Sequence, residues 1–171
     1  MPDVNDLKLR RPKIEDAEQM SEIANNFNIW INVRDTFPHP YTKDDAVFFI
    51  NLCLKENPVV TFAIEYLEEI VGFTGFILLD DIYKNTAELG FWIGESYWNK
   101  GIASMTVQKM IAYGFQELNL RRIHASVFDY NKASARVLEK NNFVQEGHFK
   151  NAITKNDKIC DEIRYALLNN D

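Results

Sequence analysis

Residues 86–128 contain a predicted strand, helix and second strand in succession, and this crossover constrains the fold more than any other feature of the sequence. Thr86–Ile93 is the predicted first strand, and a helix is predicted from about Gly101 to Leu118. Ile123, Ala125 and Val127 then alternate with less apolar residues, a pattern that is typical of a half-buried strand. Because one helix connects the two strands, we expect them to lie parallel in one sheet.

The rest of the chain predicts further strands and helices around this crossover. The composition, 46% hydrophobic and 26% charged over 171 residues, is that of one globular domain spanning residues 1–171. The remaining strands are predicted at 7–12, 59–66, 70–79, 143–151 and 159–168, and the remaining helices at about 15–27, 28–34, 42–54 and 131–141. The predicted fold class is α+β, with a mixed, largely antiparallel central sheet flanked by helices.

Charge and composition exclude several classes of protein. The net charge of −6, from 19 basic and 25 acidic residues, argues against a nucleic-acid partner and is compatible with a cationic substrate. No apolar run approaches the ~20 residues that span a bilayer, so we expect no membrane partner. The N-terminal residues lack the features of a secretory signal, which favours a cytoplasmic location. Cys53 and Cys160 are too few for a zinc site, and no metal is expected.

The loop between the first strand and the helix of the crossover has the composition of an anion site. Gly101 lets the backbone approach an anion, Ala103 keeps the next turn narrow, and Lys100 adds a positive charge. The first amides of a helix also lack intrahelical acceptors and carry the positive end of its dipole, which suits a phosphate or pyrophosphate. The spacing matches neither the Walker loop nor the dinucleotide fingerprint. The alternative is that Gly101 merely makes a tight turn before the helix.

Four motifs occur in an order that resembles one enzyme family. They are Ala87–Trp92, Tyr97–Ala103, Asn131–Phe143 and Asp161–Leu168. Together they resemble the GNAT N-acetyltransferase superfamily, and within it the RimJ/RimL-like branch, over about residues 7–168. Two positions depart from the common pattern: Trp98 stands where the wider superfamily has Arg or Gln, and Asn142 stands in place of Gly. Asn142 is compatible with the left-handed conformation that a helix end requires.

The resemblance implies a cofactor site for acetyl-CoA as co-substrate. It implies that the sheet splays between the strands 88–93 and 123–128 and that pantetheine pairs there with the backbone of Phe91, Trp92 and Ile93. It also implies contacts of Asn131 and Ser134 near the cofactor sulfur. The implied pyrophosphate loop consists of Trp98, Asn99, Lys100, Gly101, Ile102, Ala103 and Ser104.

Two side chains are candidates for the chemistry. Glu88 is the candidate base, acting through water, and the alternative is an ordinary strand glutamate or ion-pair partner. Ser134 is a candidate donor to the departing thiolate, and the alternative is a capping role at the start of its helix. Arg34, His39 and Tyr41 lie in or beside a proline-rich segment that, by the resemblance, borders the acceptor mouth, although a plain surface loop explains them equally well. His124 is interpreted as structural.

The predicted function is acetyl transfer from acetyl-CoA to a primary amine, either a protein N-terminal α-amine or a small-molecule amine, by direct attack in a ternary complex. The alternatives are a non-catalytic acyl-CoA-binding module of the same fold and a nucleotide-binding protein that uses the same anion loop. The resemblance also implies a homodimer. Fold resemblance alone does not choose the acceptor.

Overall fold

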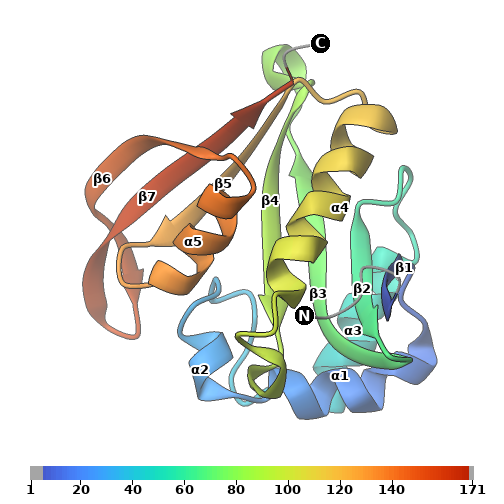
Figure 1. Ribbon diagram of the computed structural model, residues 1–171. Coiled ribbons are helices and arrows are strands. Elements are labelled where there is room, and N and C mark those ends of the chain that lie inside the picture. Colours follow the sequence, from blue (N-terminus) through green and yellow to red (C-terminus); the bar gives the residue numbers. More distant parts are fainter. Residues whose placement is uncertain (1–5, 170–171) are drawn as a thin grey trace. The chain divides into compact units, whose positions relative to one another are not determined.

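The computed structural model describes residues 6–169 and contains a seven-stranded sheet with five α-helices among them (Figure 1). In chain order the elements are β1 (Leu7–Arg10), α1 (Ala17–Ala24), α2 (Phe27–Trp30), α3 (Lys43–Cys53), β2 (Thr61–Tyr66), β3 (Glu69–Leu78), β4 (Thr86–Ile93), α4 (Ile102–Gln116), β5 (Arg122–Phe128), α5 (Lys132–Lys140), β6 (Val144–Lys155) and β7 (Lys158–Leu168).

The strand order in the sheet is β1-β2-β3-β4-β5-β7-β6. The neighbours β4 and β5 are parallel, whereas β1 with β2, β2 with β3, β5 with β7 and β6 with β7 are antiparallel. This arrangement confirms the predicted α+β class and the parallel crossover through α4. Pairing between β4 and β5 covers 86–88 and 122–124, and no further register position joins these two strands in the described part of the chain.

Contacts divide the chain into two compact units, which are described separately. The first unit comprises the residues up to Gly75 together with Phe91–Thr106. Its main core lies where α1 and α3 pack together, with Met20 and Ile50 among the fully buried side chains. A second buried cluster joins Leu7, Ile64 and Val71 to the start of α4. Apolar residues at helical spacing therefore cover the strands of this unit, as the sequence predicts.

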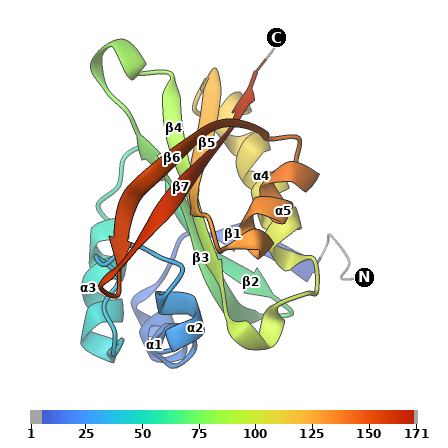
Figure 2. The same ribbon diagram turned by 90° about the vertical axis from the view of Figure 1, so that its left-hand side faces the viewer.

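The second unit comprises Phe76–Gly90 and the residues from Val107 on. The alternation predicted for β5 is confirmed, because Ile123, Ala125 and Val127 are buried and the residues between them are half-buried. The helix α5 begins at Lys132, after Asn131, and its Leu138 is fully buried. Figure 2 shows β6 and β7 as a long twisted hairpin.

The start of α3 illustrates how local sequence sets an element boundary. Thr42 accepts a hydrogen bond from the Asp45 amide at 3.2 Å, and the Asp45 carboxylate accepts one from the Thr42 amide at 2.8 Å. Together these two bonds form a capping box. It fixes where α3 begins and thereby places the apolar face of α3 against α1.

Two turns differ from the sequence-based boundaries. The β2–β3 turn was expected over 67–69, but β3 begins at Glu69, so the turn is only Leu67 and Glu68, both with positive φ. The strand β6 continues to Lys155, four residues beyond the expected end, through an irregular register between Phe149 and Ile153. Asn151, with a φ of 54°, lies in that irregular stretch and lets the strand continue past it.

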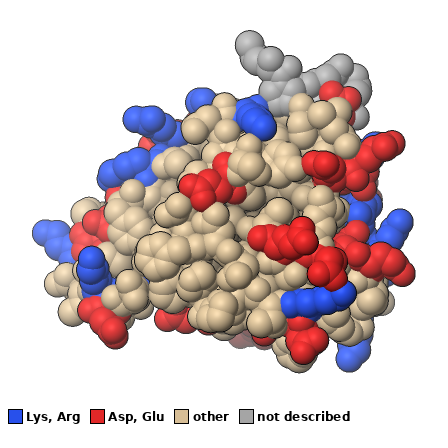
Figure 3. All heavy atoms as spheres, turned by 90° about the horizontal axis from the view of Figure 1, so that it is seen from below, with Lys and Arg blue, Asp and Glu red and all other residues tan. Residues whose placement is uncertain are grey.

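In the face shown in Figure 3, acidic and basic side chains of the described residues are interspersed rather than gathered into one basic patch. None of the helices that the structure describes is long and apolar enough to cross a membrane.

Candidate functional site

The segment between β4 and α4 folds as a compact loop in the first unit. A short 3-10 turn, Glu95–Tyr97, follows β4, and the indole Nε1 of Trp98 donates to the carbonyl of Ile93 at 2.7 Å. The Lys100 ammonium lies 5.1 Å from the centre of the Tyr97 ring, within the range of a cation–π contact. The hydrogen bond from Trp98 therefore holds the loop against the end of β4, while Lys100 and Gly101 are exposed.

Two residues of this loop adopt left-handed backbone conformations. Asn99 has a φ of 61° and Gly101 a φ of 83°. Asparagine and glycine are the residues that tolerate this region best. A Cβ built on Gly101 would meet no heavy atom within 4 Å, so the glycine is required by conformation and leaves open space at the helix start. Both the tight turn and the anion site predicted from the sequence need this geometry.

The amides that follow Gly101 belong to the first turn of α4. The helix begins at Ile102, and its first helical hydrogen bond runs from the Met105 amide to the Gly101 carbonyl at 3.1 Å. The earlier amides of a helix have no intrahelical acceptor and carry the positive end of the dipole. The loop and the first turn of α4 are therefore compatible with the predicted anion site, which stays a prediction.

The end of β4 makes a close backbone contact that the sequence did not reveal. A Cβ on Gly72 would lie 2.1 Å from the carbonyl oxygen of Trp92, a distance that no real side chain allows. The Trp92 ring stacks on Phe73, with ring centres 5.8 Å apart, and the Gly94 amide donates to the Val71 carbonyl at 2.7 Å. The segment Phe91–Ile93 is therefore fixed from the β3 side. A single glycine inside a strand pattern was the only sequence signal for this contact.

Glu88 lies in the second unit, where β4 pairs with β5. Its neighbours Ala87 and Leu89 are buried on one face of the sheet, and Glu88 is half-buried on the other face. Its register partner on β5 is His124. Partners in a parallel pair carry their side chains on the same face, about 4.8 Å apart along the sheet. The structure therefore brings Glu88 and His124 together, although no sequence motif marks this pair.

Asn131 and Ser134 lie at the start of α5. The Asn131 side chain accepts a hydrogen bond from the Ser134 amide at 3.1 Å, so Asn131 caps the start of α5. The Ser134 side chain is half-buried in the first turn of the helix. In this bond the backbone amide of Ser134 is the donor and the side chain of Asn131 is the cap. The bond therefore gives no support to the alternative that the Ser134 side chain caps the helix.

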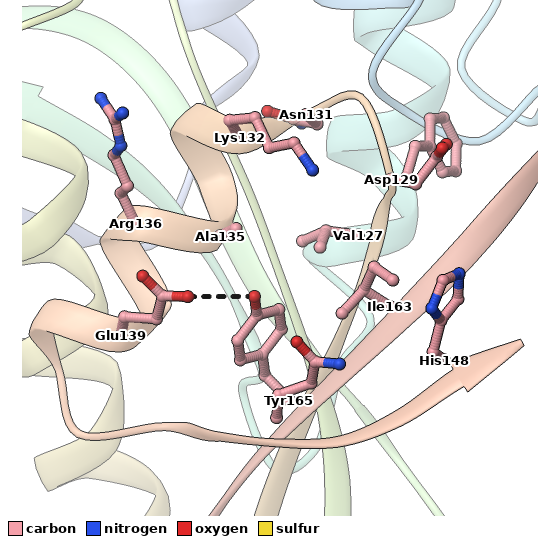
Figure 4. A pocket seen from close by; sticks show the side chains of 12 residues that line it. Val127, Asp129, Asn131, Lys132, Ala135, Arg136, Glu139, His148, Ile163 and Tyr165 are labelled. Atoms are coloured by element: carbon pink, nitrogen blue, oxygen red, sulfur yellow. Dashed lines mark hydrogen bonds between the residues drawn. The ribbon is translucent and has the colours of Figure 1, made fainter.

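A hollow of about 400 Å³ lies between α5 and the strands β5, β6 and β7 in the second unit (Figure 4). Val127 and Ile163 form part of its apolar floor, and the Tyr165 hydroxyl donates to Glu139 at 3.1 Å on one wall. Polar and charged side chains complete the lining: Asp129, Asn131, Lys132, Arg136, Gln145 and His148. Of the predicted cofactor residues, only Asn131 lines this hollow.

The segment predicted to border the acceptor mouth is only partly a surface loop. Arg34 and His39 are exposed, and the His39 ring stacks on Trp30 with ring centres 5.5 Å apart. Tyr41, in contrast, is only 5% exposed and belongs to the core cluster of α1 and α3, where it packs against Phe37. Burial also raises the pKa of Tyr41. The surface-loop alternative therefore does not hold for Tyr41, whose ring helps to anchor the segment.

Neither of the two cysteines is exposed. Cys53 is buried in the core of the first unit, and burial raises the pKa of its thiol to about 12. Cys160 is half-buried in β7 with a raised pKa whose largest cause is burial. Among residues 6–169, no group of three or more His, Cys, Asp and Glu side chains is placed to hold a metal ion.

The model of the acetyltransferase (GNAT) domain matches residues 6–144, and the chain belongs to this family. The predicted family, fold and acetyltransferase activity are thereby confirmed.

Relatives and a solved structure agree with this assignment. The chain is 31% identical over 166 residues to the uncharacterized N-acetyltransferase p20 of Bacillus licheniformis, covering 95% of this chain and 92% of that protein. It is 34% identical over 101 residues to the ribosomal-protein-serine acetyltransferase of Escherichia coli, covering 59% of this chain and 56% of that protein, which supports the RimJ/RimL-like resemblance. The structure of the Vibrio cholerae spermidine N-acetyltransferase in complex with CoA and spermine matches with a TM-score of 0.82 at 26% identity, covering 96% of each chain.

Proposed function

We propose that this protein transfers the acetyl group of acetyl-CoA to a primary amine by direct attack in a ternary complex. The observation that carries the proposal is the exposed β4–α4 loop, in which Asn99 and Gly101 take left-handed conformations directly before the first turn of α4. Membership in the acetyltransferase family supplies the reaction class.

We assign the cofactor contacts by their backbone chemistry. The pyrophosphate is proposed to bind the amides around Lys100, Gly101, Ala103 and Ser104, with Trp98, Asn99 and Ile102 completing the loop. The pantetheine arm is proposed to pair with the backbone of 91–93 like an added strand. The short register between β4 and β5 supports this, because both strands extend beyond their last paired residues. Asn131 and Ser134 are proposed to face the sulfur end.

The acceptor must lose a proton before it attacks the thioester. An α-amine, with a pKa of about 7.7–8.0, is roughly 10–20% neutral at pH 7, whereas a lysine-like amine with a pKa of about 10.4 is below about 0.1% neutral. Glu88, half-buried where the β4–β5 pairing ends, is the proposed base, acting through water. Ser134 is proposed to donate a hydrogen bond to the departing thiolate.

The acceptor is proposed to be a protein N-terminal α-amine or a small-molecule amine. Similar proteins named above act on a ribosomal protein and on spermidine, and the net charge of −6 suits a cationic acceptor of either kind. Arg34 and His39 are the proposed acceptor contacts on the exposed part of the segment before α3.

A homodimer and a cytoplasmic location complete the proposal. Sedimentation at micromolar concentration tests whether the protein is a homodimer.

A non-catalytic acyl-CoA-binding module is the competing function. It shares the anion loop but makes no use of Glu88. The deciding experiment measures thiol release from acetyl-CoA with a panel of polyamines, aminoglycosides and peptides with free N-termini, for the native protein and for Glu88→Gln. Glu69→Gln, a second strand glutamate whose carboxylate accepts the Tyr97 hydroxyl, is the matched control.

We expect turnover with one acceptor class, a loss of at least about a hundredfold in Glu88→Gln, and an unchanged acetyl-CoA affinity. The Glu69→Gln control should keep most of its activity. If acetyl-CoA raises the melting temperature but no acceptor turns over, the binding module is favoured. If acetyl-CoA gives no shift, the anion-loop assignment is wrong.

A further inference from the structure

His124 is the titratable side chain nearest to Glu88 by strand register. The two residues are partners at the last paired position of β4 and β5, and both are half-buried on the same face of the sheet. On the other side of His124, β7 contributes Ala166 as the register partner. His124 therefore lies beside the proposed base, and its direct register partner on β7 is the small residue Ala166.

The imidazole has an unusual hydrogen-bonding state. Its Nδ1 atom is buried and has no hydrogen-bond partner within residues 6–169. A buried polar atom without a partner costs about 1–3 kcal/mol, so such an atom calls for an explanation. The ring nitrogens of a structural histidine are normally hydrogen-bonded, whereas Nδ1 of His124 has no partner within residues 6–169.

The charged groups around His124 are paired with each other. Arg122, two residues earlier on β5, donates to both carboxylate oxygens of Glu146 on β6. Arg164 on β7 donates to Glu162 at 2.7 Å and lies over the Phe149 ring, and Ser126 also donates to Glu162 at 3.1 Å. The described groups that face the imidazole are thus two arginine–carboxylate pairs and Glu88.

These surroundings keep the imidazole neutral. Burial lowers the pKa of His124, the charge of Glu88 opposes that change, Arg164 and Arg122 lower the pKa further, and Glu162 raises it. Since the net direction is downward from an ordinary value of about 6.5, the ring is neutral at pH 7 and can accept a proton.

We propose that His124 is a relay residue that takes the acceptor's proton from Glu88 and passes it to solvent. This inference rests on the proposed function, because it deepens the role assigned to Glu88. An N–H bond of the ammonium breaks as an O–H bond forms on the intervening water, which gives up one of its own protons as a carboxyl O–H bond forms on Glu88. That O–H bond then breaks as an N–H bond forms on the imidazole, and the imidazolium finally gives its proton to water. Glu88 and His124 both return to their starting states.

The relay has a thermodynamic reason. An ordinary glutamate, with a pKa of about 4.3, is a weak acceptor for the proton of an ammonium whose pKa is about 7.7 or higher. Imidazole is ordinarily a stronger base than a carboxylate, with a pKa of about 6.5, so an imidazole beside the proposed base can take the proton on from the carboxyl group.

The test is the pH profile of kcat for His124→Gln beside the native protein. We expect kcat to fall by about tenfold or more and KM for acetyl-CoA to stay within about twofold. We also expect the variant to lose the decrease of kcat at acidic pH that protonation of the imidazole causes in the native protein. Ser126→Ala, a half-buried residue on the same strand and face, is the control and should keep the native profile. A kcat loss with an unchanged profile shape, or no loss at all, overturns the relay.

A second measurement holds even if His124→Gln folds poorly. The chain has three histidines, so the imidazole of His124 can be followed by NMR in the native protein and in Glu88→Gln. We expect the pKa of His124 to fall in Glu88→Gln, because a favourable negative charge is removed. An unchanged titration overturns the inference. If Glu88→Gln keeps full turnover, the proposed base itself fails. If it is inactive while His124→Gln has native kinetics, only the relay fails.

Discussion

At the scale of single residues, two glycines that look alike in the sequence have opposite structural roles. A Cβ on Gly72 would collide with the backbone carbonyl of Trp92 at 2.1 Å, whereas a Cβ on Gly90 would meet nothing within 4 Å. Gly72→Ala should therefore destabilise the protein by about 1–3 kcal/mol, since backbone atoms must move, and should weaken acetyl-CoA binding by shifting 91–93. Thermal unfolding and cofactor titration measure both effects. Gly90→Ala is the control, and equal losses in both variants would contradict the explanation.

A second residue-scale prediction concerns an ion pair at the start of the chain. Arg10 donates to both carboxylate oxygens of Asp16 at 2.8 Å and to Glu65 at 2.6 Å. Burial alone would raise the pKa of Asp16, but the hydrogen bonds from Arg10 and from the Lys13 amide outweigh it and lower that pKa. Arg10→Met should cost about 3 kcal/mol at pH 7, because it leaves the buried carboxylate without its partner.

The pH dependence follows from the direction of that shift. A lowered pKa in the folded state adds stability above the ordinary value of about 3.9, and this stability is lost as the pH falls through the folded pKa. The native protein should therefore lose this contribution below about pH 4. Urea unfolding of Asp16→Asn from pH 3 to pH 7 should show a smaller pH dependence, and an identical curve would contradict the assignment.

Residue roles were the least predictable part of the sequence. Glu88 and Asn131 could be chosen because each lies in a recognisable motif. The burial of Tyr41 and the contact at Gly72 could not be predicted, because both depend on segments distant in the sequence that meet only in the folded protein. His124 had no motif, and only the strand register shows that it is the partner of Glu88.

At the scale of elements, the helix α3 depends on a boundary that its own sequence defines. Thr42→Ala removes the hydroxyl that caps the Asp45 amide and should cost about 1 kcal/mol, equivalent to a fall of about 2–4 °C in melting temperature. Differential scanning calorimetry measures the shift. Thr36→Ala, in the exposed loop after α2, is the matched control and should change the melting temperature far less.

Elements whose signals are local were predicted well, and turns were predicted less well. The capping box, the alternation in β5 and the left-handed Asn142, with a φ of 64°, all follow from neighbouring residues. The Leu67–Glu68 turn has positive φ at both positions without the asparagine or glycine that usually marks such a turn, so its length could not be predicted. The pairing of β2 with β3 overrides the local preference.

At the scale of the whole molecule, the last hairpin completes the pairing of the strand that carries His124. The family model ends at residue 144, yet β7 pairs with β5 along the whole length from Arg122 to Phe128. A chain that stops after Phe143 should therefore fail to fold, because β5 loses its antiparallel neighbour. Circular dichroism and solubility test this. Asp157→Gly in the β6–β7 turn, where φ is 58°, is the control and should fold normally.

The division of the chain into two units also bears on how the protein is made. The first unit is interrupted: the chain leaves it after Gly75 and returns only at Phe91. A ribosome that has released residues up to Gly90 has therefore not yet supplied the Phe91–Ile93 backbone that contacts Gly72. Although domains usually fold in order as they are synthesised, neither unit here is one continuous stretch. The first unit is complete only when residue 106 has been synthesised. By then the chain already contains Phe76–Gly90, the first segment of the second unit.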